Sequence, residues 1–243
     1  MRYRNLGVVI GAAAILSGCA AAQTALTHKD LAVQTKMSAT IFLDPVPVSD
    51  HTIFIQTRNT TDKPDFTIDS GLRAALAAKG YQVVTDPTAA HYVLQANILS
   101  VGKIDPSAAQ TAFLGGYGST LGAAAAGASI GLIGGQSVGA GLAGGILGGA
   151  TDLVANALVK NVTYAVITDM QISERSAAPV TQTTAAHVQQ GTTATREQVS
   201  TTTTNHQTFQ TRILSTANQV NLDFADAEPA LEKGLITSIS GVF

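Results

Sequence analysis

The sequence predicts an α+β protein, with an antiparallel β region packed against helices and a hydrophobic helical hairpin set into it. Three observations support this prediction. Alternating apolar and polar residues occur early and late in the chain, helically spaced apolar residues accompany them, and the 46 residues 106–151 include no Asp, Glu, Lys or Arg. We expect the hairpin to cross a membrane and to assemble with other copies into a ring or helical barrel.

Composition narrows the class of protein before any motif is considered. The chain has 243 residues, enough for one large or two modest domains, and 45% of them are hydrophobic. Only 12% are charged, about half of the usual fraction for soluble proteins. The net charge is -2, and no cluster of Lys and Arg could neutralise a run of phosphates. A membrane-associated protein is favoured, and nucleic acid is excluded as a partner.

The N-terminus has the pattern of a lipoprotein signal peptide over residues 1–18. Arg2 and Arg4 form a basic start, and residues 6–16 form an apolar stretch too short to span a membrane. The stretch ends in the letters LSGC at Cys19, which resemble the lipobox where a diacylglycerol and an N-acyl chain are attached. Cys19 is also the only cysteine, so it cannot form an internal disulfide. The alternative is an ordinary signal peptide with an incidental cysteine.

Acylation of Cys19 would fix the location of the protein. Several buried acyl chains anchor a protein far more firmly than one chain does, so the expected partner is the lipid of a bacterial membrane. Ala20 follows the cysteine in place of the Asp that retains many lipoproteins in the inner membrane. We therefore expect an outer-membrane lipoprotein of a Gram-negative bacterium, with residues 19–40 as a lipidated tether.

The first part of the α+β domain is expected over residues 41–105. Thr67 could cap a helix in which Leu72 and Leu76 share one face, and Lys79-Gly80 would end it. The flanking stretches have strand character. The expected order is a strand over residues 52–57, this helix, and strands over 81–85 and 91–101.

The second part of this domain is expected over residues 159–243. Residues 162–173 alternate with a period of two, which is typical of a half-buried strand. Residues 191–204 are rich in Thr, and Asn205-His206 is a turn candidate before further alternation up to Phe224. A final helix would be capped by Asp226 and would bury Leu231, Leu235 and Ile239.

Between these two parts, residues 106–158 form the expected hairpin, with helices over 117–133 and 138–158. Glycines recur every fourth residue, and such a bare stripe allows helix backbones to touch in a membrane. The glycines expected to pack helices and oligomerise are Gly127, Gly131, Gly135, Gly139, Gly141, Gly145 and Gly149. The alternative is a flexible Gly/Ala linker or low-complexity loop. A dinucleotide-binding loop is excluded because no preceding strand and following acid complete that motif.

The sequence contains no catalytic or metal-binding pattern. Its five histidines are scattered without zinc-ligand spacing, and its serines lack the context of an activated nucleophile. We therefore expect no enzyme activity, no metal and no cofactor other than the lipid on Cys19.

Several long segments resemble the TraT family of surface-exclusion and complement-resistance proteins, and the resemblance covers essentially the whole mature chain. The matching segments are residues 31–45 (LAVQTKMSATIFLDP), 59–63 (NTTDK), 78–85 (AKGYQVVT), 95–97 (QAN), 167–175 (ITDMQISER), and 211–212 (TR) leading to 218–224 (NQVNLDF). The glycine-rich segment also lies where the family has one.

The resemblance implies a homo-oligomeric outer-membrane lipoprotein that blocks redundant conjugative mating and in some hosts reduces complement killing. Its further partner would be a surface component of a mating donor cell. Residues exposed around 112–120, including Phe113 and Tyr117, or at the hairpin tip near Gln136 would carry recognition. The alternative is a structural glycine-zipper envelope lipoprotein without exclusion activity. A pore ranks last, because the hairpin has no charged residue to line one.

Overall fold

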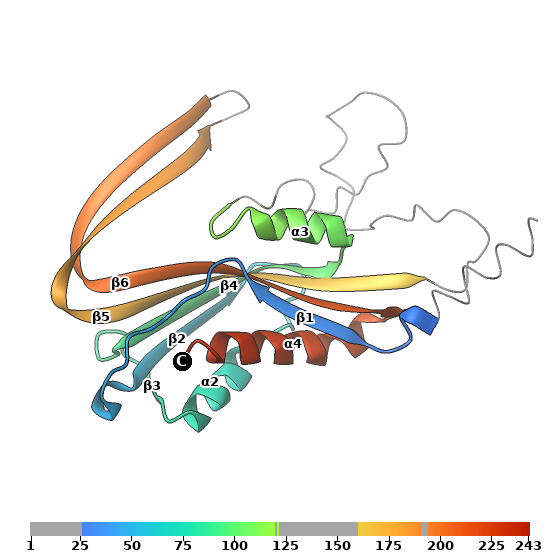
Figure 1. Ribbon diagram of the computed structural model, residues 1–243, viewed down its shortest axis with the longest axis horizontal. Coiled ribbons are helices and arrows are strands. Elements are labelled where there is room, and N and C mark those ends of the chain that lie inside the picture. The colour runs from blue at the N-terminus through green and yellow to red at the C-terminus, as the bar shows by residue number, and fades with distance from the viewer. Residues whose placement is uncertain (1–25, 120, 122–159, 191–193) are drawn as a thin grey trace, which may run out of the picture.

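The computed structural model describes residues 26–119, 121, 160–190 and 194–243, with the side chains of 185–190 and 194–198 left aside (Figure 1). One six-stranded sheet with helices on both faces forms the body of the molecule. The elements are β1 (Ala32–Met37), η1 (Val48–Asp50), β2 (Thr52–Asn59), α2 (Asp69–Ala78), β3 (Gln82–Val84), β4 (Tyr92–Lys103), α3 (Pro106–Leu114), β5 (Asn161–Gln190), β6 (Ala194–Val220) and α4 (Phe224–Ser240).

The sheet is mixed, which corrects the expectation of an antiparallel β region. The strand order is β1-β6-β5-β4-β2-β3, and β2 runs parallel to both β3 and β4. The other pairs are antiparallel. The parallel pairing of β2 with β3 follows from the connection between them, because α2 carries the chain back across the sheet before β3 begins.

Helices α2 and α4 cover one face of the sheet, and α3 lies on the opposite face (Figure 1). Alternation in β2 turns Ile53 and Ile55 toward α2 and α4, where both are buried. Leu72 and Leu76 of α2, and Leu231, Leu235 and Ile239 of α4, complete this main core. The helical spacing seen in the sequence therefore does mark the buried face of both helices.

Strands β5 and β6 extend far beyond the sheet. They have 30 and 27 residues, and their outer parts, residues 180–190 and 194–204, form a two-stranded ribbon that we call the arm. The arm curls toward the side of the sheet that carries α3 (Figure 1). The pairing register shifts between Arg175 and Val180, at the base of the arm. The expected turn at Asn205-His206 was wrong, since both residues lie within β6.

The predicted transmembrane helical hairpin was also wrong. Within the described ranges, no helix is long and apolar enough to cross a membrane. Helix α3 ends at Leu114, and Gly116 and Gly118 then adopt left-handed backbone conformations around Tyr117, where the first hairpin helix was expected to begin. The seven candidate packing glycines from Gly127 to Gly149, together with Cys19 and Gln136, lie outside the described residues.

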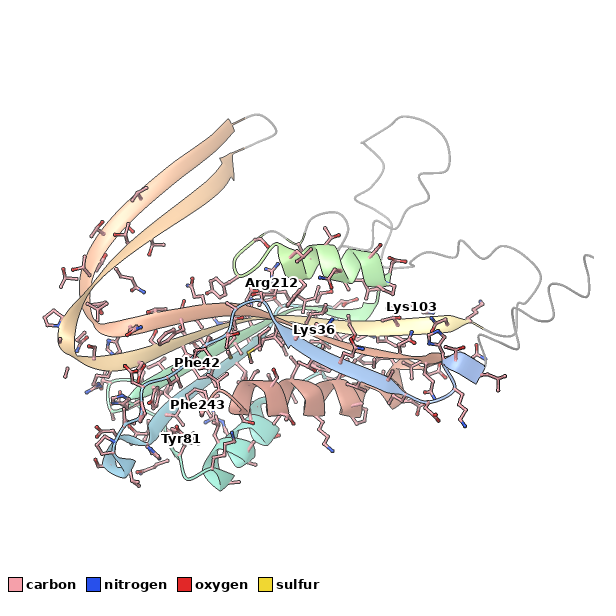
Figure 2. All side chains as sticks on the ribbon, in the orientation of Figure 1. Lys36, Phe42, Tyr81, Lys103, Arg212 and Phe243 are labelled. Carbon is pink, nitrogen blue, oxygen red and sulfur yellow. The ribbon has the colours of Figure 1, made fainter. Side chains whose placement is uncertain are left out.

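An aromatic cluster closes the end of the main core next to the C-terminus. The ring of Phe243 packs edge-on against Tyr81 and Tyr92, at centroid distances of 5.4 and 5.5 Å (Figure 2). Glu174 is buried beside this cluster, with 5% of its surface exposed, and His91 Nε2 lies 3.9 Å from its Oε1. Burial raises the pKa of Glu174 and lowers the pKa of His91, because desolvation disfavours the charged form of each group.

Replacing Glu174 with Gln should change how stability depends on pH. A carboxyl whose folded pKa is raised stabilises the fold below its unfolded value of 4.5, and this contribution is lost as the pH rises through the folded pKa. The melting temperature of Glu174→Gln should therefore gain on that of the wild type as the pH rises above 4.5 and through the raised folded pKa of Glu174. Thermal melts of both proteins at a series of pH values from acid to neutral test this prediction. If the difference between the two melting temperatures does not change with pH, the Glu174 carboxyl does not contribute to the pH dependence of stability.

Candidate recognition surface

A buried arginine organises the face of the sheet that carries α3. Arg212 on β6 (Figure 2) is fully buried. The strand pairing places it directly opposite Asp169 on β5. Its Nε donates to Asp169 Oδ1 over 2.7 Å, and its Nη2 donates to Oδ2 over 3.0 Å. This two-pronged geometry is the strongest form of an arginine–carboxylate contact.

The same guanidinium also binds the chain that follows α3. Arg212 Nη1 donates to the carbonyl of Ala112 and to Ser119 Oγ, and Nη2 donates to the carbonyl of Ser119, over 2.7 to 2.9 Å. With the two bonds to Asp169, all five N–H groups of the arginine have partners. A buried charge is costly unless it is paired and hydrogen-bonded, and here both conditions hold. We call this set of contacts the Arg212 clip.

Glycines shape the segment that the clip holds, residues 115–119. A Cβ on Gly115 would lie only 2.5 Å from Ser119 Oγ, so a larger residue would push Ser119 out of its contact with Arg212. Gly116 and Gly118 have φ values of 72° and 70°, a conformation that other residues rarely adopt. The N–H of Gly118 donates to Asp169 Oδ2 over 2.9 Å. The segment is therefore fixed against the sheet from both β5 and β6.

This segment presents Tyr117 to solvent. The side chain is 38% exposed, and its hydroxyl donates to Gln171 Oε1 over 3.3 Å. Partial burial, with the nearby charge of Asp169, raises the pKa of the phenol. Phe113 is instead partly buried, in a second core beneath α3 that includes Ile167 and Leu214. Of the two aromatic candidates for recognition, the structure therefore brings Tyr117 to the polar surface and packs Phe113 under α3.

Beside Tyr117, four glutamines line up across four strands. The pairing register places Gln56 beside Gln95, Gln95 beside Gln171, and Gln171 beside Gln210. Gln95 Nε2 donates to Gln56 Oε1 over 2.7 Å, Gln171 Nε2 to Gln95 Oε1 over 3.4 Å, and Gln210 Nε2 to Gln171 Oε1 over 2.8 Å. We call Gln56, Gln95, Gln171 and Gln210 the glutamine ladder.

An open groove of about 270 Å³ lies between the ladder and the clipped segment. We call it the ladder groove. Its lining residues are Gln56, Arg58, Gln95, Ala96, Asn97, Tyr117, Gly118, Asp169 and Gln171. Sequence reasoning pointed to Tyr117 but missed the glutamines, because only the strand pairing brings residues so far apart in the chain into one row.

The structure offers no metal centre in the ranges that it describes. No group of three or more His, Cys, Asp or Glu side chains there could hold a metal ion. The only contact between a histidine and a carboxylate among the described residues is that of His91 with Glu174, which lies beside the aromatic cluster. The polar groups that face solvent around the clip are instead the neutral amides of the ladder, the phenol of Tyr117 and the exposed guanidinium of Arg58.

Removing the carboxylate from the clip should destabilise the protein strongly. Asp169→Ala leaves Arg212 buried and unpaired, a change that typically costs about 3–5 kcal/mol. Asp65→Ala, at an exposed carboxylate, should cost no more than about 0.5 kcal/mol. Urea unfolding measures both costs, and chymotrypsin should cleave at Phe113 or Tyr117 more readily in Asp169→Ala. Similar unfolding free energies for the two variants would contradict the role of the clip.

Comparison with known proteins gives a consistent result over nearly the whole chain. Residues 30–243 match a family model described as "Enterobacterial TraT complement resistance protein". The chain is 42% identical to a TraT complement resistance protein of Escherichia coli, over 100% of both chains, and 42% identical to one of strain K12, over 100% of this chain and 99% of the relative. A relative of the same name from Wigglesworthia glossinidia brevipalpis is 27% identical over 94% of this chain and 91% of its own. This is not an enzyme family. The chain belongs to the TraT family.

Proposed function

We propose that this protein is an outer-membrane lipoprotein, anchored through Cys19, that lowers the uptake of conjugative plasmids by the cell that carries it. The observation that carries the proposal is the family match over residues 30–243, which implies a bacterial envelope protein. Resistance to complement, the activity in the names of the relatives, is a second part of the same proposal. The lipobox at Cys19 supplies the membrane attachment.

The polarity of the fold supports this proposal. The backbone N–H of Val220 donates to the carbonyl of His28, and the N–H of the next residue, Asn221, donates to the carbonyl of Lys160. The first described residues therefore lie near the beginning of β5. The arm lies at the other end of β5 (Figure 1). Cys19 is seven peptide steps before Leu26, which is at most about 25 Å of extended chain. A lipid on Cys19 would thus hold one end of the molecule near the membrane and leave the arm remote from it.

Self-association is part of the proposal, and we place it at the arm. Within the described residues, the arm has two strands and no third neighbour on either edge. Isolated two-stranded ribbons are marginally stable in water, and unpaired edges readily accept further strands. The arm has only two charged residues, Arg196 and Glu197, which are of opposite sign, and Thr181, Thr183 and Thr201 are exposed. A second copy of the chain could therefore add its own arm against little net charge.

Removing the arm should reduce assembly and leave the body folded. Residues 181–203 can be replaced by Asn-Gly, since Val180 pairs with Thr204 and this dipeptide favours a two-residue hairpin turn. Native mass spectrometry in detergent should then show mainly monomer for the shortened protein and oligomers for the full chain. Retained oligomers in the shortened protein would place the interface elsewhere.

The proposed exclusion activity predicts a lower frequency of plasmid transfer into recipients that express the protein. Transfer should fall several-fold relative to an empty vector and should return to the vector value with Cys19→Ser, which cannot be acylated. Mass spectrometry of the wild type should find an acylated Cys19 as the first residue. Exchange of residues 112–119 with those of a relative tests whether this segment selects the plasmid type. Equal transfer into all recipients would favour an envelope protein without exclusion activity.

A further inference from the structure

The geometry points to the ladder groove as a binding site for a neutral glycan that carries hydroxyl and acetamido groups. This inference goes beyond the proposed function, and it can be tested on purified protein whether or not the cell excludes plasmids. The first step is the hydrogen-bonding capacity of the ladder. Each glutamine amide has two N–H groups and two acceptor sites. Each contact within the ladder uses one N–H group of the donor and one acceptor site of its neighbour.

The ladder therefore retains donors and acceptors for a ligand. Among the glutamines that line the groove, Gln95 and Gln171 each keep a second N–H, and Gln56 keeps both of its own. Asn97 also lines the groove, and its buried Oδ1 has no hydrogen-bond partner among the described residues. Sugar hydroxyls both donate and accept, and an acetamido group pairs with a glutamine amide as one amide pairs with another. The groove thus offers alternating partners for such groups.

The charges in the groove favour a neutral ligand. Arg58 is the only cation among its lining residues, and Asp169 already binds Arg212 and the N–H of Gly118. The groove therefore has too little opposite charge to attract a phosphate-rich ligand or a strongly basic one. Neutral amides are suited to groups that exchange hydrogen bonds without carrying charge.

Tyr117 provides the apolar contact that a sugar ring needs. Tyr117 lines the groove from the clipped segment, is 38% exposed, and its hydroxyl donates to Gln171. Aromatic rings with one polar end are suited to ligands that are apolar on one face and wet on the other. The apolar C–H face of a sugar could pack on the phenol ring while its hydroxyls reach the glutamines.

An extended peptide fits this groove less well. Neighbouring strands are spaced by about 4.8 Å, so the ladder repeats at that distance, whereas residues on one face of a peptide strand repeat at about 6.7 Å. Peptides that add to sheets do so at an edge, and the ladder lies on a face. Among the lining residues, the only large apolar surface is the Tyr117 ring, so peptide side chains would find few pockets.

The test measures binding of chitotetraose, a β-1,4-linked tetramer of N-acetylglucosamine, to the full acylated protein in detergent by ligand-observed NMR. Binding should weaken at least tenfold in Gln95→Leu and in Gln171→Leu, which keep similar side-chain volume without the amide. Gln82→Leu is the matched control, because Gln82 is exposed on β3 outside the groove. Tyr117→Phe should bind nearly as the wild type does, and Tyr117→Ala should not. Thermal melts would verify that each variant is folded.

Two natural sources of such sugars can then be distinguished. Peptidoglycan glycan strands stripped of their stem peptides form one arm, and lipopolysaccharide oligosaccharide freed of lipid A forms the other. Loss of binding to chitotetraose or to either glycan in the ladder variants supports the inference. No binding to any of the three, binding unchanged in Gln95→Leu and Gln171→Leu, or binding of free stem peptides alone would overturn it.

Discussion

The contact between Arg212 and Asp169 is the constraint on which the α3 face of this protein depends. It joins β5 to β6 and fixes the chain that leaves α3, because one guanidinium binds a carboxylate and three further oxygens. None of these oxygens would hold the segment alone, since a single hydrogen bond to a charged group contributes only about 1.5–3 kcal/mol of net stability. Their convergence on one buried charge makes them interdependent: losing any partner leaves part of that charge unpaired.

The position of the clip also explains why the two faces of the sheet differ. Along β5, alternate residues on the α3 face change from apolar to polar: Ile167 lies under α3, Asp169 binds the clip, and Gln171 belongs to the ladder. Helix α3 therefore covers this face of the sheet only as far as the apolar residues of the face extend. On the other face, Met170 and Ile172 continue the core under the helices, so that face can be closed without polar partners.

The sequence predicted the parts of this fold that depend on local periodicity. The buried faces of α2 and α4 and the alternation in β2 and β4 follow from spacing alone, because each requires only a 3.6-residue or two-residue repeat. The parallel pairing of β2 and the continuity of β6 through Asn205 could not be predicted this way, since they depend on which strands become neighbours. Residues 206 and 175 pair across β5 and β6, and this pairing overrides the local turn preference at 205–206.

The transmembrane hairpin failed as a prediction for a related reason. A glycine-rich, uncharged segment satisfies a membrane-helix pattern by composition, yet Gly116 and Gly118 are used here for turn geometry beside Asp169. The candidate site was only partly accessible to sequence reasoning as well. Tyr117 could be identified as an aromatic residue in an otherwise small-residue segment, whereas the glutamine ladder exists only through the register of β2, β4, β5 and β6.

The clip and the ladder are therefore two consequences of the same strand register. Asp169 and Gln171 are two residues apart on β5, and Arg212 and Gln210 are two residues apart on β6, so both rows turn toward the same face about 6.7 Å apart. Asp169 in the clip anchors the segment that carries Tyr117, and Gln171 in the ladder accepts a hydrogen bond from the Tyr117 hydroxyl. A one-residue slip between β5 and β6 would separate Arg212 from Asp169 and break the ladder in the same step. The pairing that stabilises this face thus also positions the groups that could bind a ligand on it.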